Sequence, residues 1–189
     1  MHSRMIFPGA CAGVLCAMPA CRQAPPPDGP PVTTVYDSKT GKLSELLSDR
    51  NGDGKNDTHA FMDGALLQRV EIDKNGDGTP DRFEYYLPPS AGGTAQQPWL
   101  DHVEERLDGR VVRRETYSRG VIARVEEDTD ADGRIDKWET YENGTLVRMD
   151  LDLTGRGTPD RRLVYGPNGE VTAVQSDPDG DGRFETVSH

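Results

Sequence analysis

Acidic and amide side chains recur at fixed offsets in four short segments of the chain. In each segment position 1 is Asp, position 3 is Asp or Asn, position 5 is Asp, position 6 is Gly, and position 9 is Asp or Glu. The oxygen-bearing residues are Asp49, Asn51, Asp53, Asp57, Asp73, Asn75, Asp77, Asp81, Asp128, Asp130, Asp132, Asp136, Asp177, Asp179, Asp181 and Glu185. Two segments add a Glu at position 12, Glu84 and Glu139. Calcium takes about six to eight oxygens at about 2.3–2.6 Å, and a loop of this spacing supplies them, so the pattern predicts about four Ca²⁺ sites.

Repulsion among these carboxylates favours a bound cation. Two carboxylates about 4 Å apart repel by about 4 kcal/mol at an effective dielectric constant near 20. A loop that gathers three of them tends to open unless a positive ion lies between them. Magnesium suits such a loop less well, because it demands a smaller octahedral shell and keeps its waters. A single Asp-Gly segment is also typical of a plain surface turn, but four segments in register favour metal binding.

Two further segments have the same register but carry arginine where a ligand is expected. Arg106 is at position 3 of the segment that begins at Glu104, and Arg156 is at position 5 of the segment that begins at Asp152. An internal arginine supplies a positive charge of its own. We therefore hypothesise that arginine replaces the ion in these two units.

The segments recur about every 24 residues, and an insertion at residues 88–98 lengthens one period. Between segments, two short runs of β-branched and aromatic residues flank a turn, as around Asn143-Gly144, which is a strong hairpin signal. Runs of about five residues suit strands and are too short for helices. The sequence predicts an all-β fold, in which tandem hairpins of about 24 residues form an elongated antiparallel sheet with the calcium loops along one edge. We expect the aromatic residues to stack along this ladder as a small core.

The acidic loops resemble the EF-hand-like calcium loops of thrombospondin type 3 repeats and of bacterial dockerins. The resemblance implies calcium ligation by Asp49, Asn51, Asp53, Asp57 and their equivalents in the other three segments. The hairpins resemble the MORN-type repeats of bacterial surface proteins. The period leaves no room for the paired helices of a true EF-hand, which argues against a calmodulin-like sensor.

The first residues have the features of an export signal. Arg4 precedes an apolar stretch of small residues that Pro8 and Pro19 make unsuitable as a membrane span. The segment Met18 to Cys21 resembles a bacterial lipobox, in which cleavage exposes a cysteine that carries lipid. After cleavage Cys21 is the only cysteine left, as a lipidation site would explain. An ordinary secretory signal cut nearby is the alternative.

These features divide the chain into three parts. Residues 1–20 form the expected signal peptide, residues 21–31 the lipidated Cys21 and a proline-rich tether, and residues 32–189 the repeat domain. No Asp follows Cys21, which by resemblance to sorted lipoproteins implies an outer-membrane destination in the cell envelope. A secreted or periplasmic protein is the alternative localisation.

Composition narrows the function. The net charge of −11 argues against nucleic acid as a partner, and 33% hydrophobic residues are little material for one deep core. An active site normally occurs once in a chain, whereas these acids recur from loop to loop, so we do not expect the protein to be an enzyme. The leading interpretation is a calcium-binding structural or interaction lipoprotein. A surface adhesin or scaffold that binds protein or polysaccharide is the alternative. An envelope hydrolase, with a pocket near the insertion and Trp99, Asp101 and His102, is a further one.

Overall fold

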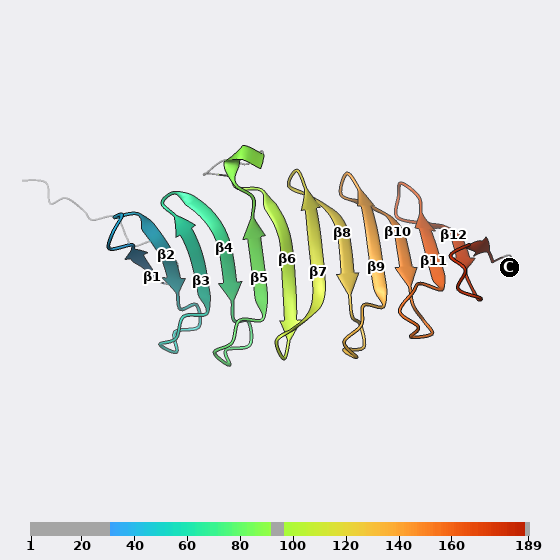
Figure 1. Cartoon of the computed structure of the whole chain (residues 1–189), viewed down its shortest axis with the longest axis horizontal. Helices are drawn as coiled ribbons and strands as arrows, with labels where there is room; N and C mark the ends of the chain where they lie inside the picture. The colour runs from blue at the N-terminus through green and yellow to red at the C-terminus, as the bar shows by residue number, and fades with distance from the viewer. Residues whose placement is uncertain (1–30, 92–96, 188–189) are drawn as a thin grey trace, which may run out of the picture.

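In the computed structural model, which describes residues 31–91 and 97–187, the chain forms one antiparallel sheet of thirteen strands. Each strand pairs with the next strand along the sequence, and the sheet forms an elongated ribbon (Figure 1). The strands are β1 (Val32–Tyr36), β2 (Leu43–Ser48), β3 (Thr58–Asp63), β4 (Leu66–Ile72), β5 (Arg82–Tyr86), β6 (Leu100–Leu107), β7 (Arg110–Ser118), β8 (Val121–Glu127), β9 (Lys137–Glu142), β10 (Thr145–Leu151), β11 (Arg161–Tyr165), β12 (Val171–Ser176) and β13 (Glu185–Thr186). The predicted all-β array of hairpins is confirmed.

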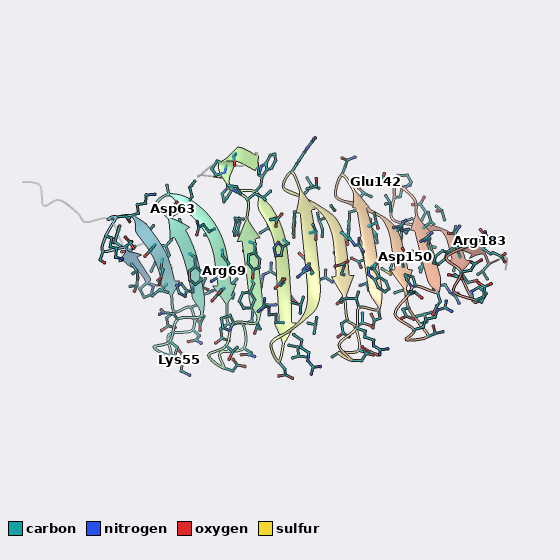
Figure 2. The ribbon with its side chains drawn as sticks, viewed as in Figure 1. Lys55, Asp63, Arg69, Glu142, Asp150 and Arg183 are labelled. Carbon is teal, nitrogen blue, oxygen red and sulfur yellow. The ribbon has the colours of Figure 1, made fainter. Side chains whose placement is uncertain are left out.

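The connections divide between the two long edges of the ribbon. The acidic segments and the tight turn between β6 and β7 lie along one edge, here called the loop edge. The other tight hairpin turns lie along the opposite edge, the turn edge (Figure 1). Figure 2 places Lys55 at the loop edge, and Asp63 and Glu142 at the turn edge. The turn at Asn143-Gly144 has φ of 51° and 82°, as the predicted hairpin requires.

The insertion between β5 and β6 contains a short 3-10 helix, η1 (Pro89–Ala91), at the turn edge. The part of the chain that the structure describes contains no helix long and apolar enough to cross a membrane. The signal peptide, Cys21 and most of the tether lie outside the described residues.

A second layer does not cover either face of this sheet within the described ranges, so the core is very small (Figure 1). Val103 and Val125 are the two fully buried large side chains among the described residues. We call the face that carries Tyr86, Tyr117 and Tyr141 the tyrosine face. Val103 and Val125 lie on this face, each directly opposite Glu115 on the intervening strand. The fully buried side chains are thus two valines within one face, and not the aromatic residues that were expected to form the core.

Guanidinium groups and aromatic rings cover the opposite face. Arg69 lies 4.2 Å from the centre of the Phe61 ring, and Arg106 lies 4.1 Å from the centre of the Phe83 ring. Arg106 also donates to the buried carboxylate of Glu104 at 2.7 Å. Cation–π contacts and charge-assisted hydrogen bonds of this kind stabilise a sheet where a second apolar layer is missing.

The buried valines provide a test of this small core. Val125→Ala should lower the free energy of unfolding by about 2 kcal/mol, because it removes two buried methyl groups and leaves a cavity. Val171→Ala is the matched control, since Val171 is 48% exposed on β12 and should change stability by less than about 0.5 kcal/mol. Urea denaturation of the two variants measures both effects. Equal losses would contradict the assignment of Val125 to the core.

Candidate metal-binding loops

The four predicted segments form loops at the same edge of the sheet, each between an even-numbered strand and the next odd-numbered one. They connect β2 to β3, β4 to β5, β8 to β9 and β12 to β13 (Figure 1). Each loop is anchored at its base. The Asp57 N–H, for example, donates to the Ser48 carbonyl at 2.9 Å. The loops are also joined to one another, since the Asp73 N–H donates to the Asp57 carbonyl at 2.8 Å.

The carboxylate at position 1 organises the turn of each loop. Asp49 accepts from the N–H of Gly52 at 2.7 Å and from that of Gly54 at 2.8 Å. The glycine at position 6 needs positive φ, which is 89° at Gly54. Position 4 has the same left-handed conformation even at Ala131, where φ is 61°.

The side chains at positions 3 and 5 each accept a backbone N–H two residues further on. In the first loop Asn51 accepts from Asp53 at 2.8 Å, and Asp53 accepts from Lys55 at 2.8 Å. Position 9 closes the loop from the other side, since the buried carboxylate of Asp57 accepts from the Arg50 N–H at 2.8 Å. These bonds turn the carboxylates towards one another.

Three of the loops bring acidic groups together. Within each group, one carboxylate oxygen from each residue lies within 4.8 Å of the others. The groups are Asp49 with Asp53 and Asp57, Asp128 with Asp130 and Asp136, and Asp177 with Asp179 and Asp181. Three loops of the chain can therefore hold a metal ion. Oxygen donors of this type suit a hard divalent cation.

The remaining predicted ligands are placed differently. The loop of Asp73, Asn75, Asp77 and Asp81 has the same hydrogen bonds, including the Gly76 N–H to Asp73 at 2.7 Å, but no such group of three acids. Asp132 accepts from the Arg134 N–H at 2.8 Å. Glu185 is exposed on β13, outside the group that Asp177 belongs to.

Backbone donors favour the ionised form of two loop carboxylates, Asp177 and Asp152. Partial burial opposes ionisation of Asp177, yet the N–H groups of Gly182 and Gly180 hold the pKa of its carboxyl below the usual value. The same balance of burial against the N–H groups of Gly157 and Arg156 lowers the pKa of Asp152. These loops therefore present charged carboxylates near neutral pH.

The structure does not bring the two position-12 glutamates into the loops, which differs from the expectation. Glu84 lies on β5, where its carboxylate accepts from Arg82 at 2.9 Å and from the Tyr86 hydroxyl at 2.7 Å. Glu139 lies on β9 with Lys137 at 2.9 Å and the Tyr141 hydroxyl at 2.7 Å. Both glutamates belong to the tyrosine face of the sheet.

The sequence contains a signal that places these glutamates in the strands. A basic residue, Glu and Tyr alternate along β5, β7 and β9, as in Arg113, Glu115 and Tyr117. The strand β7 has this triplet although a two-residue turn at Asp108-Gly109, rather than an acidic loop, precedes it. The glutamate is therefore a feature of the strand.

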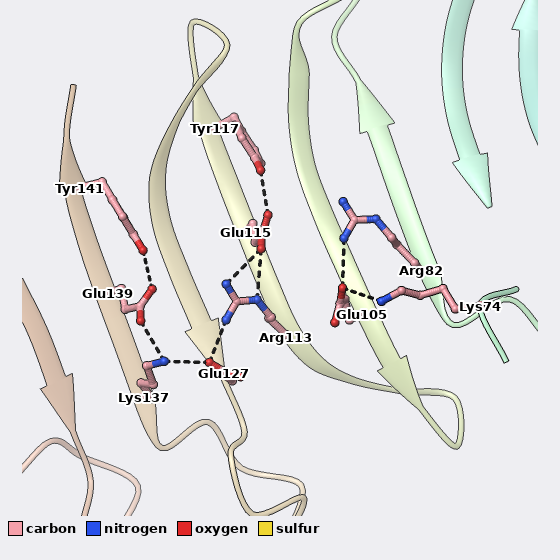
Figure 3. A network of polar contacts seen from close by, with 10 residues as sticks. All are labelled: Lys74, Arg82, Glu105, Arg113, Glu115, Tyr117, Glu127, Lys137, Glu139 and Tyr141. Carbon is pink, nitrogen blue, oxygen red and sulfur yellow. Dashed lines mark hydrogen bonds and ion pairs between the residues drawn. The ribbon is translucent and has the colours of Figure 1, made fainter. Parts of the chain in front are cut away.

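Ion pairs connect these triplets across the sheet. Glu127 on β8 accepts from Arg113 at 2.8 Å and from Lys137 at 3.1 Å, which joins β7 to β9 (Figure 3). Glu105 on β6 pairs with Lys74 and Arg82, each at 3.0 Å (Figure 3). These two charge networks lie side by side on the tyrosine face next to the loop edge.

The two arginines that were expected to replace an ion do not lie among the carboxylates of an acidic loop of their own. Arg106 points to the opposite face of the sheet, onto Phe83 and Glu104. Arg156 reaches the neighbouring loop, where it donates to the carbonyls of Asp177 and Pro178. Its own loop keeps the common shape, because Asp152 still accepts from the N–H of Gly157. Arg156 thus fastens one loop to the next.

A cavity of about 160 Å³ lies beside the insertion at the turn edge. It is lined by Leu66, Leu67, Gln68, Tyr86, Leu87, Pro88, Pro89 and Pro98. Trp99, Asp101 and His102, which the hydrolase alternative places at such a pocket, are not among these residues. His102 instead stacks on Tyr85 with ring centres 4.3 Å apart and contacts Asp101 at 2.8 Å.

Comparison with known proteins adds little to this geometry. No family model matches the chain, and no curated protein matches it. A solved structure with partial similarity is a mutant of S. aureus TarM in complex with fondaparinux, alpha-GlcNAc-glycerol and UDP, with 8% identity and a TM-score of 0.36. The similarity covers 77% of this chain and 21% of that chain.

The tyrosine–glutamate pairs predict a loss of stability at high pH. Burial, followed by the hydrogen bond to Glu115 and its charge, raises the pKa of Tyr117 from 10.0 to about 12, and Tyr141 is raised likewise by burial and Glu139. The folded chain thus favours the neutral phenols, so their contribution is complete below pH 10 and lost as the pH rises to about 12.

Replacement of both phenols tests this assignment. The double variant Tyr117→Phe, Tyr141→Phe should have a free energy of unfolding that falls less steeply between about pH 10 and 12 than that of the parent chain. Urea denaturation across this range, together with phenolate absorbance of the folded parent, measures the difference. Identical slopes for the parent and the variant would exclude these two phenols as the cause.

Proposed function

We propose that this chain is a calcium-binding structural repeat protein of the cell envelope. The observation that carries the proposal is the repetition of one loop conformation with carboxylates gathered inside it. Three loops hold groups of acidic oxygens within 4.8 Å of one another. The loop that begins at Asp73 has the same hydrogen bonds, and the amide oxygen of Asn75 is a further potential ligand there. The proposal comprises four calcium sites, one in each loop.

The physical role of the ion is to offset repulsion. Each loop turns several carboxylates to one side, and the backbone donors that hold Asp177 ionised also keep its charge there. A divalent ion between these groups removes the repulsion and stabilises the folded loop. Calcium fits better than magnesium, because irregular shells of carboxylate and amide oxygens match its flexible coordination.

The repetition of the loops supports a structural rather than a catalytic role for the ion. Acidic loops recur along one edge of the sheet. Neighbouring loops are joined through hydrogen bonds such as that from the Asp73 N–H to the Asp57 carbonyl. Stability of a repeat array depends on each unit and on its contacts with the next. Calcium bound at several loops therefore stiffens the whole ribbon.

The proposed location rests on the sequence before the sheet. Cys21 and residues 22–30 lie outside the described residues, and the ribbon begins at Val32. A lipid on Cys21 and the prolines that follow would hold the sheet away from the outer membrane on a semi-rigid tether. Mass spectrometry of the protein extracted from membranes tests this, since lipid on Cys21 adds the mass of acyl chains to the peptide that contains it.

Calcium titration tests the metal sites. Isothermal titration calorimetry of the full-length chain should detect about four ions, and calcium at 100 times its Kd should add about 2.7 kcal/mol per site to the free energy of unfolding. Asp136→Asn should lose one site, because it removes one charge from the group with Asp128 and Asp130.

A matched control separates metal binding from loop stability. Asp160 occupies position 9 of the loop that contains Arg156, as Asp136 does in its own loop, and accepts from the Thr154 N–H at 2.9 Å. Asp160→Asn should therefore leave the number of bound ions unchanged. A parent chain that takes up no calcium, and melts at the same temperature in calcium and in EGTA, would overturn the proposal.

A substitution in the same loop should create a site. Arg156→Asp completes the ligand pattern of the loop that begins at Asp152 and already has the common conformation, so we expect one additional bound ion. Calorimetry against the parent chain measures the change in stoichiometry. Arg156→Ala controls for the lost bonds to Asp177 and Pro178, and it should add no ion. An unchanged stoichiometry in Arg156→Asp would contradict the ligand assignment.

A further inference from the structure

The two ends of the sheet differ in length and charge. At one end β13 (Glu185–Thr186) has two residues and includes an acid. At the other end β1 (Val32–Tyr36) has five residues, Val-Thr-Thr-Val-Tyr, none of them charged. Val32 is 58% exposed and Tyr36 is 61% exposed. The uncharged strand β1 therefore ends a sheet whose chain is 29% charged.

Exposed edge strands are normally protected. The backbone N–H and C=O groups on the outer side of an edge strand are free to pair with another strand, and proteins block such pairing with charge, proline, bulges or very short strands. β13 has two of these features, because it is short and acidic. Residues 32–36 have no charge and no proline, and the one register shift near them places the extra residue, Ser44, on β2. The β1 edge is thus open to pairing.

The sequence of β1 is complementary to itself in the antiparallel direction. With Thr34 placed on a two-fold axis, Val32 lies opposite Tyr36 of a second copy, Thr33 lies opposite Val35, and Thr34 lies opposite Thr34. Aromatic with β-branched and Thr with Thr are favourable cross-strand combinations, each contributing about 0.2–1 kcal/mol. No pair places like charges together.

We propose that the chain forms a symmetric dimer in which the β1 strands of two copies pair antiparallel about Thr34. The axis is perpendicular to the sheet, so the two ribbons join into one continuous sheet and each face continues across the junction. Near the junction the tyrosine face carries Leu46 and Ala60, both uncharged, next to Thr34. The charged pairs of this face begin further along the ribbon, at Lys74 in the loop after β4 and at Arg82 on β5.

The difference between the two ends limits the assembly to two copies. A head-to-tail filament would need β1 of one copy to pair with β13 of another, and β13 offers only two residues, one of them Glu185. A pair of β1 strands instead uses both open edges and leaves only protected ones. Because the junction is a single strand pair, it is smaller than a standard interface, and we expect a Kd in the micromolar to millimolar range.

Charge substitution on the axis tests the dimer. Sedimentation velocity of the full-length chain in calcium buffer, over concentrations up to about 1 mM, should show monomers of 20.8 kDa in equilibrium with dimers. Thr34→Lys and Thr34→Glu should each abolish the dimer, because like charges then lie directly opposite each other. An equimolar mixture of the two variants should restore it, since Lys then faces Glu.

The mixture and a second position distinguish pairing from misfolding. Restoration in the mixture shows that each variant remains folded, and circular dichroism of the separate variants checks the sheet directly. Thr186→Lys, on β13 at the other end of the ribbon, should leave dimerisation unchanged. A chain that stays monomeric at every concentration would overturn the proposal. Pairing of residues 1–31 with β1 of the same chain would be one such outcome. A dimer that survives both Thr34 variants, or assembly into longer polymers, would also overturn it.

Discussion

Cross-strand pairing of polar side chains is the interaction on which this structure depends. A single-layer sheet buries little apolar surface, and Val103 and Val125 are the large side chains buried completely within the described ranges. The hydrophobic contribution that usually stabilises a domain of this length is therefore small. Ion pairs such as those of Glu127 with Arg113 and Lys137 take its place, and each crosses from one strand to the next. Exposed pairs contribute little singly, but a network ordered by a regular sheet contributes more.

The sequence predicted the fold well because its strongest signals are local. The Asn143-Gly144 turn and the Asp-Gly loops mark both edges of the sheet, and the short runs between them leave room only for strands. A meander then follows, in which each strand pairs with its neighbours along the sequence. The loop that begins at Asp49 was likewise predictable, since its hydrogen bonds lie within nine residues.

The errors concern residues whose partners lie outside their own acidic loop. Glu139 fits position 12 of a calcium loop, but its partners are Lys137 and Tyr141 on its own strand. The loop spacing alone cannot distinguish these roles, because position 12 and the third residue of the following strand coincide. The alternation of basic residue, Glu and Tyr could have done so. Arg156 was misjudged for a similar reason, as its partners lie in the next loop, 21 and 22 residues away.

The loop that begins at Asp152 separates the shape of these loops from their capacity to bind a cation. It lacks an acid at positions 3 and 5, yet Asp152 accepts from the Gly157 N–H and Asp160 from the Thr154 N–H. Asp49 and Asp57 accept from the equivalent N–H groups of the first loop. The conformation therefore depends on the acids at positions 1 and 9 and on the glycines. The acids at positions 3 and 5 add charge that the fold itself does not require. Such excess charge lowers stability unless it is neutralised, so a cation is the simplest reason for its presence in the other loops.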